Sequence, residues 1–154
     1  MSLLFHSFRI SLVAIAALLC LSATSWAQQG QRPFEGYFTY ADYEVYLRLN
    51  VYEQDITIPG QELYGQLPGY LSREQNAFSW PVVEAEVVSD KTPVQARLTL
   101  INDFGSEDCT CMLTQVDDST YTLRQLSGAT LKVARQGKWQ KLPKEFTLKR
   151  RPKK

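Results

Sequence analysis

Histidine is almost absent from this chain, and this absence excludes several kinds of catalytic site. The 154 residues contain one histidine, His6, inside an N-terminal segment that we expect to be removed. Without it, neither a Ser-His-Asp or Cys-His nucleophilic site nor a histidine-containing zinc site can form. We therefore expect a protein that is not an enzyme, and a hydrolase that works through carboxylates is the less favoured alternative.

Long apolar runs are also missing, apart from one at the N-terminus. Segment 10–23 is almost wholly apolar over 14 residues, shorter than the roughly 20 residues of a membrane-spanning helix. Ser25 and Ala27 then match the small-x-small pattern that signal peptidase requires. We predict a signal peptide over 1–27, cleaved after Ala27, and a secreted or periplasmic protein. An uncleaved anchor and a lipid anchor through Cys20 are the alternatives.

Cysteine is scarce: after the predicted cleavage only Cys109 and Cys111 are left. On a strand, residues two apart point to the same face, with Cα atoms about 6.5–7 Å apart, at the upper limit for a disulfide. We interpret both as reduced, buried core residues that are dispensable for binding. A strained bridge is one alternative. A Cu(I) site helped by Met112 is another, although Met112 points to the opposite face. We predict no cofactor and no metal.

Helical periodicity is absent, and the pattern throughout is that of short strands. The clearest lies at 43–53, where Tyr43, Val45, Leu47, Leu49 and Val51 alternate with mostly polar residues. Segment 93–101 alternates in the same way, which predicts Leu47, Leu49, Leu98 and Leu100 in the core. Further strands are predicted at 36–41, 62–67, 80–89, 108–115, 120–125, 130–134 and 146–149. Segment 70–76 fits a strand or a helical turn.

Eight to nine short strands, with turns every eight to twelve residues, predict one all-β domain. We expect a single antiparallel meander over 28–148, closed or partly closed into a barrel. A β-sandwich is the alternative. A basic, disordered tail is expected at 149–154.

The chain resembles the lipocalin-like small secreted barrels. That family usually opens with Gly-x-Trp on its first strand, and Gly36-Tyr37-Phe38 stands at the comparable place with Phe38 instead of Trp. The family also tends to carry a basic residue near its last strand, which Arg150 or Arg151 matches. The resemblance implies a small barrel that binds an apolar ligand or a protein.

Charge is strongly divided along the chain. Segment 28–118 contains 15 acidic and five basic residues, whereas 119–154 contains 11 basic residues and one acidic residue, Glu145. This division indicates either a basic surface for an anionic partner or pairing between early and late strands within the barrel. No nucleic-acid-binding module is recognisable, so nucleic acid is not expected as a partner.

Two groups of acidic residues are weaker candidates for a site. Glu84 and Glu86 share one strand face and could form a carboxylate pair like that of retaining glycosidases, although a solvated outer face also explains them. Asp103, Glu107 and Asp108 crowd one loop and could bind Ca²⁺, although their spacing does not match an EF-hand.

The favoured site is a basic segment near the C-terminus. Lys138, Trp139 and Lys141 lie between Gly137 and Pro143, which predicts a loop at the mouth of the barrel. We expect these three residues to contact an envelope protein, an anionic glycan or a small apolar ligand, although Trp139 could instead cap the barrel. The function expected is a non-enzymatic binding or inhibitory module, and a structural or adhesive cell-envelope protein is the alternative.

Overall fold

A computed structural model describes residues 30, 32–74, 78–103 and 105–152. The predicted signal peptide, 1–27, lies outside these residues. Within the described ranges, no helix combines the length and the apolar character that crossing a membrane requires.

The described residues form short strands joined by tight turns and two single-turn 3₁₀ helices. In chain order the elements are β1 (Glu35–Tyr40), η1 (Ala41–Tyr43), β2 (Val45–Asn50), η2 (Glu62–Tyr64), β3 (Gly69–Arg73), β4 (Ser79–Ser89), β5 (Gln95–Ile101), β6 (Asp108–Gln115), β7 (Thr120–Gly128), β8 (Lys132–Arg135), β9 (Lys138–Lys141) and β10 (Glu145–Arg150).

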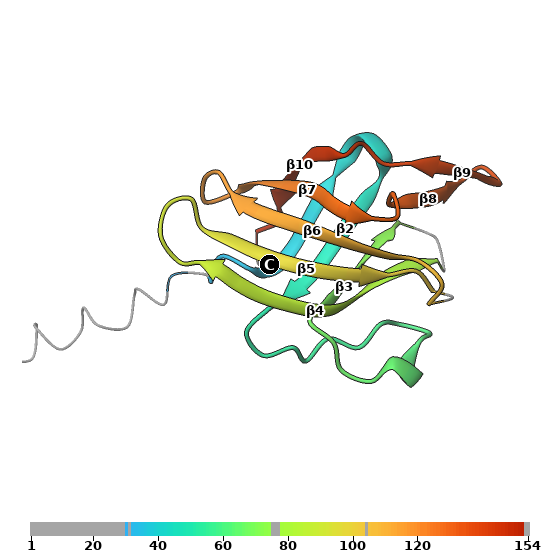
Figure 1. The fold of residues 1–154 in the computed structure, drawn as a ribbon, viewed down its shortest axis with the longest axis horizontal. Helices are drawn as coiled ribbons and strands as arrows, with labels where there is room; N and C mark the ends of the chain where they lie inside the picture. Colours follow the sequence, from blue (N-terminus) through green and yellow to red (C-terminus); the bar gives the residue numbers. More distant parts are fainter. Residues whose placement is uncertain (1–29, 31, 75–77, 104, 153–154) are drawn as a thin grey trace, which may run out of the picture. The chain divides into compact units, whose positions relative to one another are not determined.

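Eight of these strands close into an antiparallel barrel. Around the barrel the order is β1, β10, β7, β6, β5, β4, β3 and β2, and β2 pairs with β1 to complete the circle. Strands β8 and β9 pair only with each other and form a hairpin inserted between β7 and β10 (Figure 1). The predicted all-β meander barrel is confirmed, and closure leaves the barrel strands without open edges that could pair with other chains.

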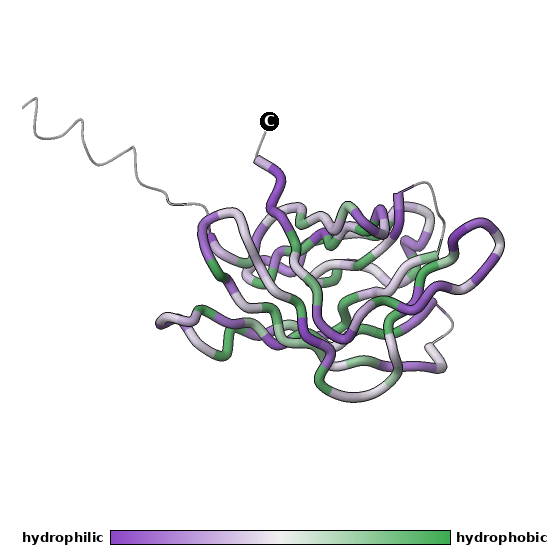
Figure 2. Tube along the Cα trace, turned by 90° about the horizontal axis from the view of Figure 1, so that it is seen from above, coloured by the Kyte–Doolittle hydropathy of each residue, from purple (hydrophilic) through white to green (hydrophobic). Residues whose placement is uncertain are grey.

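Apolar and polar residues alternate along much of the tube in Figure 2, and the apolar ones at alternate positions are buried in the interior of the barrel. Leu47, Leu49, Leu98 and Leu100 are all fully buried, as predicted. Trp80 is the largest fully buried side chain, and its indole Nε1 donates a hydrogen bond to a backbone oxygen of β8 at 2.8 Å. The interior is therefore packed with side chains, which an eight-stranded barrel is narrow enough to allow.

Arg150 closes one end of the barrel. Its Nη2 donates hydrogen bonds to the carbonyl oxygens of Arg32, at 2.6 Å, and Pro33. The guanidinium carbon lies 5.2 Å from the ring centroid of Phe38 and 5.3 Å from that of Tyr121. Of the residues that carry the family resemblance, Phe38 and Arg150 are directly opposite each other where β1 meets β10, whereas Arg151 follows the end of β10.

Segment 62–67 is not a strand, contrary to the prediction. Glu62–Tyr64 forms η2, and Leu67 makes only an isolated bridge to Ile56. Gly65, with a φ of 69°, and Pro68 interrupt the extended conformation on either side of Leu67. Ile56 packs with Ile58 and Tyr70 in a second apolar cluster, separate from the barrel core.

Other boundaries also differ from the sequence pattern. The strand predicted at 43–53 is shorter, because Tyr43 belongs to η1 and residues 51–53 form a turn, so that β2 spans only Val45–Asn50. The ambiguous segment 70–76 contributes to a strand, β3, and β7 continues three residues beyond the predicted 120–125. The predicted tail begins inside the fold, because Lys149 and Arg150 belong to β10.

Candidate functional site

Lys138, Trp139 and Lys141 lie on a strand, β9, and not in the predicted loop. The turn of the β8–β9 hairpin consists of Gln136 and Gly137, whose φ angles are 51° and 74°. Positive φ at both central residues is characteristic of a type I′ turn, whose twist matches that of a two-stranded hairpin. The segment therefore projects as a regular ribbon from the end of the barrel where β7 ends (Figure 1).

The two faces of the hairpin differ in environment. Residues directly opposite each other in a hairpin point to the same side, and successive residues alternate between sides. The inner hairpin face covers the barrel core with Leu131, Val133 and Leu142, all at most 3% exposed. The outer hairpin face consists of Lys132, Ala134, Trp139 and Lys141. Trp139 and Lys141 therefore share one face, whereas Lys138 points to the other side beside Arg135.

Trp139 does not cap the barrel. Its side chain is 53% exposed, and its ring meets that of Phe78 edge to face at a centroid distance of 4.7 Å. Phe78 in turn meets the buried Trp80 edge to face, with ring centroids 6.3 Å apart. The ammonium nitrogen of Lys132 lies 5.8 Å from the centroid of the Trp139 ring. The aromatic contacts hold the indole in place while about half of its surface stays open to solvent.

Gln125 of β7 anchors both ends of the hairpin to the barrel. Its Oε1 accepts a hydrogen bond from the backbone N–H of Leu131 at 2.8 Å, and its Nε2 donates to the carbonyl of Pro143 at 2.7 Å. Arg73, at the end of β3, donates to the carbonyl of Ala134 at 3.3 Å. These contacts are made by side chains, since no barrel strand pairs with the hairpin.

The first and the last residue pairs of the hairpin, one on each face, bring like charges together. Lys132 is directly opposite Lys141, and Arg135 is directly opposite Lys138. Like charges at such positions destabilise a strand pair. Only Lys132 has a carboxylate partner, Glu107 at 2.9 Å; within the ranges that the structure describes, no acidic side chain pairs with the other three cations. The Lys132 ammonium lowers the pKa of the Glu107 carboxyl through their hydrogen bond.

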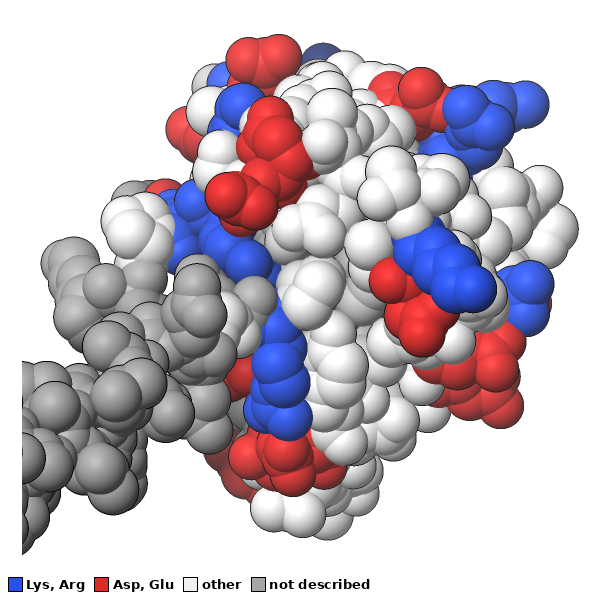
Figure 3. All heavy atoms as spheres, turned by 90° about the vertical axis from the view of Figure 1, so that its left-hand side faces the viewer, with Lys and Arg blue, Asp and Glu red and all other residues white. Residues whose placement is uncertain are grey.

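Pairing between early and late strands accounts for a small part of the charge division. Among the described residues, Lys132–Glu107 and Arg151–Glu74 join the basic C-terminal part to the acidic part. The other ion pairs lie within one part, as Arg124–Glu145 does. On the face that Figure 3 presents, basic and acidic side chains lie close together around an uncharged area, without a surface of one sign. In the β8–β9 hairpin, by contrast, cations are paired directly opposite each other.

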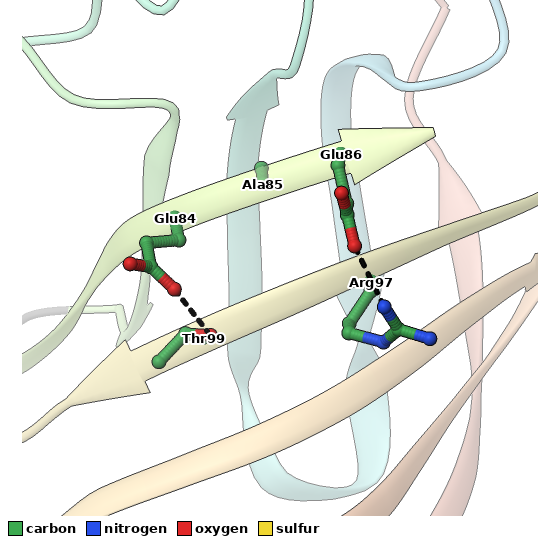
Figure 4. Close-up of a pocket in the computed structure, with 5 residues that line it drawn as sticks. All are labelled: Glu84, Ala85, Glu86, Arg97 and Thr99. Atoms are coloured by element: carbon green, nitrogen blue, oxygen red, sulfur yellow. Dashed lines mark hydrogen bonds and ion pairs between the residues drawn. The ribbon is translucent and has the colours of Figure 1, made fainter. Parts of the chain in front are cut away.

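The carboxylates Glu84 and Glu86 lie on the outer surface of β4 (Figure 4). Glu84 accepts a hydrogen bond from the Thr99 hydroxyl at 3.3 Å, and Glu86 forms an ion pair with Arg97 at 2.7 Å. Both interactions join β4 to β5 across a shallow depression that these residues line with Ala85. The arrangement is that of ordinary cross-strand pairs on a solvated face.

The acidic loop residues do not converge. Asp103 accepts hydrogen bonds from the backbone N–H and hydroxyl of Ser79 at 2.9 and 3.0 Å, whereas Glu107 turns to Lys132. The described residues contain no group of three or more histidine, cysteine, aspartate or glutamate side chains positioned to hold a metal ion.

Cys109 and Cys111 are free thiols, and both are fully buried. Their Sγ atoms lie 3.6 Å apart on the inward face of β6. Oε1 of Gln125 lies 3.8 Å from the Cys109 Sγ. The contact with Cys109 and burial both raise the pKa of the Cys111 thiol.

The sequence analysis named Lys138, Trp139 and Lys141 as candidates and did not name Lys132 or Gln125, which the structure places at the same hairpin. The turn residues Gln136 and Gly137 were recognised, and strict alternation on both sides of that turn would have placed Lys132 opposite Lys141. No local pattern marks Gln125, because its partners lie in a separate part of the fold.

No family model, curated protein or solved structure matches this chain. The interpretation of the site therefore depends on the geometry described above.

Proposed function

We propose that this protein is a non-enzymatic binding module that holds an anionic glycan against the outer face of the β8–β9 hairpin. The observation that carries the proposal is the half-exposed Trp139 on the same face as two opposed lysines, Lys132 and Lys141. A hairpin selected for stability alone would place opposite charges at such a pair. Retaining two cations there is explained if a negatively charged partner occupies the face.

The chemistry of this face suits a sugar polymer bearing acidic groups. An indole ring presents a flat, weakly polar surface on which a sugar ring can stack. The Lys141 ammonium beside it can donate hydrogen bonds to carboxylate or sulfate oxygens, which are stronger than those between neutral groups. An acidic protein surface would use the lysines without the stacking, which makes Trp139 the discriminating residue.

The packed interior is why the proposed site is on the surface. The inward side chains of the barrel fill its centre, and Arg150 and the hairpin cover its two ends. A relationship to lipocalin-like barrels is part of the proposal and is supported by the contact of Arg150 with Phe38. In this protein the binding function is assigned to an external ribbon.

The proposal includes export to the periplasm or to the outside of the cell, where envelope glycans are found. It is supported by the sequence pattern at Ser25 and Ala27. Intact mass of the protein recovered from the exported fraction is the test. A mass that begins at Gln28 supports export with cleavage, and a mass that retains 1–27 contradicts it.

Binding is tested by calorimetric titration with a sulfated polysaccharide, because this measurement does not need Trp139 as a reporter. We expect binding that weakens as salt rises, because exposed charges are screened beyond about 8–10 Å at physiological ionic strength. Trp139→Ala and Lys141→Glu should each reduce the affinity strongly. Lys138→Glu should reduce it less, because Lys138 points away from Trp139.

Lys91→Glu is the matched control. Lys91 lies in the exposed turn between β4 and β5 and its replacement changes the net charge by the same amount. Equal losses for Lys91→Glu and Lys141→Glu would reduce the interaction to non-specific attraction. An unchanged affinity in Trp139→Ala would favour an acidic protein over a glycan.

A further inference from the structure

We propose that Arg48 and the tyrosines around it form a binding site for the phosphate group of a ligand on the outer surface of β2. The inference does not depend on the proposed glycan binding. Arg48 lies between Tyr37 of β1 and Tyr70 of β3, each directly opposite it in the sheet. Tyr46 lies two residues earlier on β2, so its side chain points to the same outer face. One guanidinium and three phenols therefore share one patch of the barrel surface.

The three tyrosine rings of this patch pack against one another. The ring centroid of Tyr46 lies 6.1 Å from that of Tyr37 and 5.8 Å from that of Tyr70. Tyr70 is only 6% exposed, because it packs under the loop that follows β2, against Ile56 and Ile58. Burial raises the pKa of the Tyr70 phenol, and a hydrogen bond that its hydroxyl donates to Tyr46 raises it further. Since Tyr46 accepts this bond, its own O–H is left to donate to a ligand.

The guanidinium of Arg48 is held by stacking and not by hydrogen bonds. Its central carbon lies 4.6 Å from the centroid of the Tyr37 ring. A cation–π contact occupies the face of the planar group and leaves the N–H donors along its edge available. Within the parts of the chain that the structure describes, no carboxylate pairs with Arg48 and no acceptor takes a hydrogen bond from it. Its nitrogens are reachable from solvent, although the side chain is half-buried.

The lack of a carboxylate partner sets Arg48 apart from its neighbours in the sequence. Segment 28–118 contains 15 acidic and only five basic residues. In that segment Arg32, Arg73 and Arg97 each form an ion pair with a glutamate. Arg48 is the one arginine of the segment without such a pair among the described residues, although acidic side chains outnumber basic ones threefold. An arginine positioned on an aromatic ring and left without a carboxylate is explained if a bound anion supplies the negative charge.

The donors of the patch suit a phosphate group. The forked guanidinium matches two oxygens of a carboxylate or a phosphate through parallel charge-assisted hydrogen bonds. A carboxylate offers only those two oxygens, whereas a phosphate group has a further oxygen for the hydroxyl of Tyr46. The face of the Tyr37 ring is already covered by Arg48, so this patch offers the edge of a cation and a hydroxyl, and not an open ring for stacking.

The first test needs no variant. Inorganic phosphate is titrated into the purified protein at constant ionic strength while NMR spectra record the backbone amides and the arginine Nε–H groups. We expect the Nε–H signal of Arg48 to shift and to saturate in millimolar phosphate, whereas that of Arg97, whose guanidinium is paired with Glu86, stays in place. Equal shifts at both arginines, or a shift that never saturates, would show general ionic attraction and overturn the proposal.

Variants then assign the donors, and all the changed side chains point out of the barrel. Arg48→Gln should weaken phosphate binding by about tenfold or more, because it removes the charged donors. Arg48→Lys should recover only part of the loss, since it keeps the charge and lacks the fork. Tyr46→Phe should weaken binding by about threefold to tenfold, the effect of one hydrogen bond. Arg97→Gln is the matched control and should leave the affinity unchanged. Full affinity in Arg48→Gln would contradict the assignment.

The phosphate group can belong to a soluble ligand or to a lipid headgroup, and vesicles of phosphatidylglycerol distinguish the two sources. Co-sedimentation with the vesicles that Arg48→Gln abolishes identifies a headgroup, whereas binding of free phosphate without the vesicles identifies a soluble ligand. Lys141→Glu should leave the affinity for free phosphate unchanged, so this proposal and the glycan proposal can fail separately. Binding of neither free phosphate nor vesicles, or acetate bound as tightly as phosphate, would overturn the inference.

Discussion

Replacing Lys141 by Glu should stabilise the fold while it weakens binding. Lys141 is directly opposite Lys132 in the hairpin, and the substitution converts a like-charge pair into an opposite-charge pair. Each such pair changes stability by about 0.2–1 kcal/mol, so the full difference is about 0.4–2 kcal/mol. Lys141 is exposed and Lys132 already has Glu107 as a partner, which places the expected gain near the lower end, about 0.5–1 kcal/mol.

The free energy of unfolding from urea titration measures this gain. The hairpin unfolds with the barrel because Leu131, Val133 and Leu142 belong to the core cluster, so one transition reports both. A double-mutant cycle with Lys132→Met isolates the pair. In the Lys132→Met background, Lys141→Glu should no longer raise the free energy of unfolding, because the opposite charge is gone. Lys91→Glu controls for net charge. A Lys141→Glu protein that is less stable than the original would refute the argument that the hairpin cations are retained for binding.

Three further predictions concern the stability of the fold. Leu98→Ala should lower the free energy of unfolding by about 2–5 kcal/mol, since Leu98 is fully buried; a loss under about 0.5 kcal/mol in urea would exclude it from the core. Arg150→Met should lower the free energy of unfolding by about 1–3 kcal/mol, because the carbonyls of Arg32 and Pro33 lose their charged donor and keep only the Glu35 N–H and the Tyr121 hydroxyl; Arg150→Lys should recover only part of the loss, since it lacks the forked guanidinium. The pKa of Glu107 is lowered from 4.5 by Lys132, so its ion pair stabilises the fold above pH 4.5 and loses this effect as the pH falls through the lowered value. The stability difference between the original protein and Glu107→Gln, followed by urea unfolding from pH 7 to 3, should therefore vanish at the acidic end; a difference independent of pH would contradict the assignment.

The strands of the barrel were predictable because their signal is local. The alternation around Leu47 and Leu49 reports a strand with one buried face, whatever that strand pairs with. Segment 108–115 was predicted with the bounds that the structure shows for β6. Segment 62–67 misled the same reasoning, because a short run of apolar and polar residues can alternate in a loop that packs on the outside of a sheet.

The candidate surface was predictable in part. Trp139 and Lys141 were identified from their proximity in the chain and from the basic composition around them. Their placement on a strand was missed because Gly137 and Pro143 were interpreted as bounding a loop, whereas Gly137 belongs to the hairpin turn and Pro143 follows β9.

The sequence by itself determined most of the barrel strands, which side of those strands is apolar, and that cations accumulate after residue 118. These properties depend on neighbours within a few residues. Only the tertiary structure decided that Lys132 faces Lys141, that Gln125 holds the hairpin, and that Arg150 lies on Phe38, 112 positions earlier in the chain. Barrel closure and hairpin register bring such groups together, and no local pattern encodes which distant side chains will meet. The proposed binding surface depends on those long-range contacts.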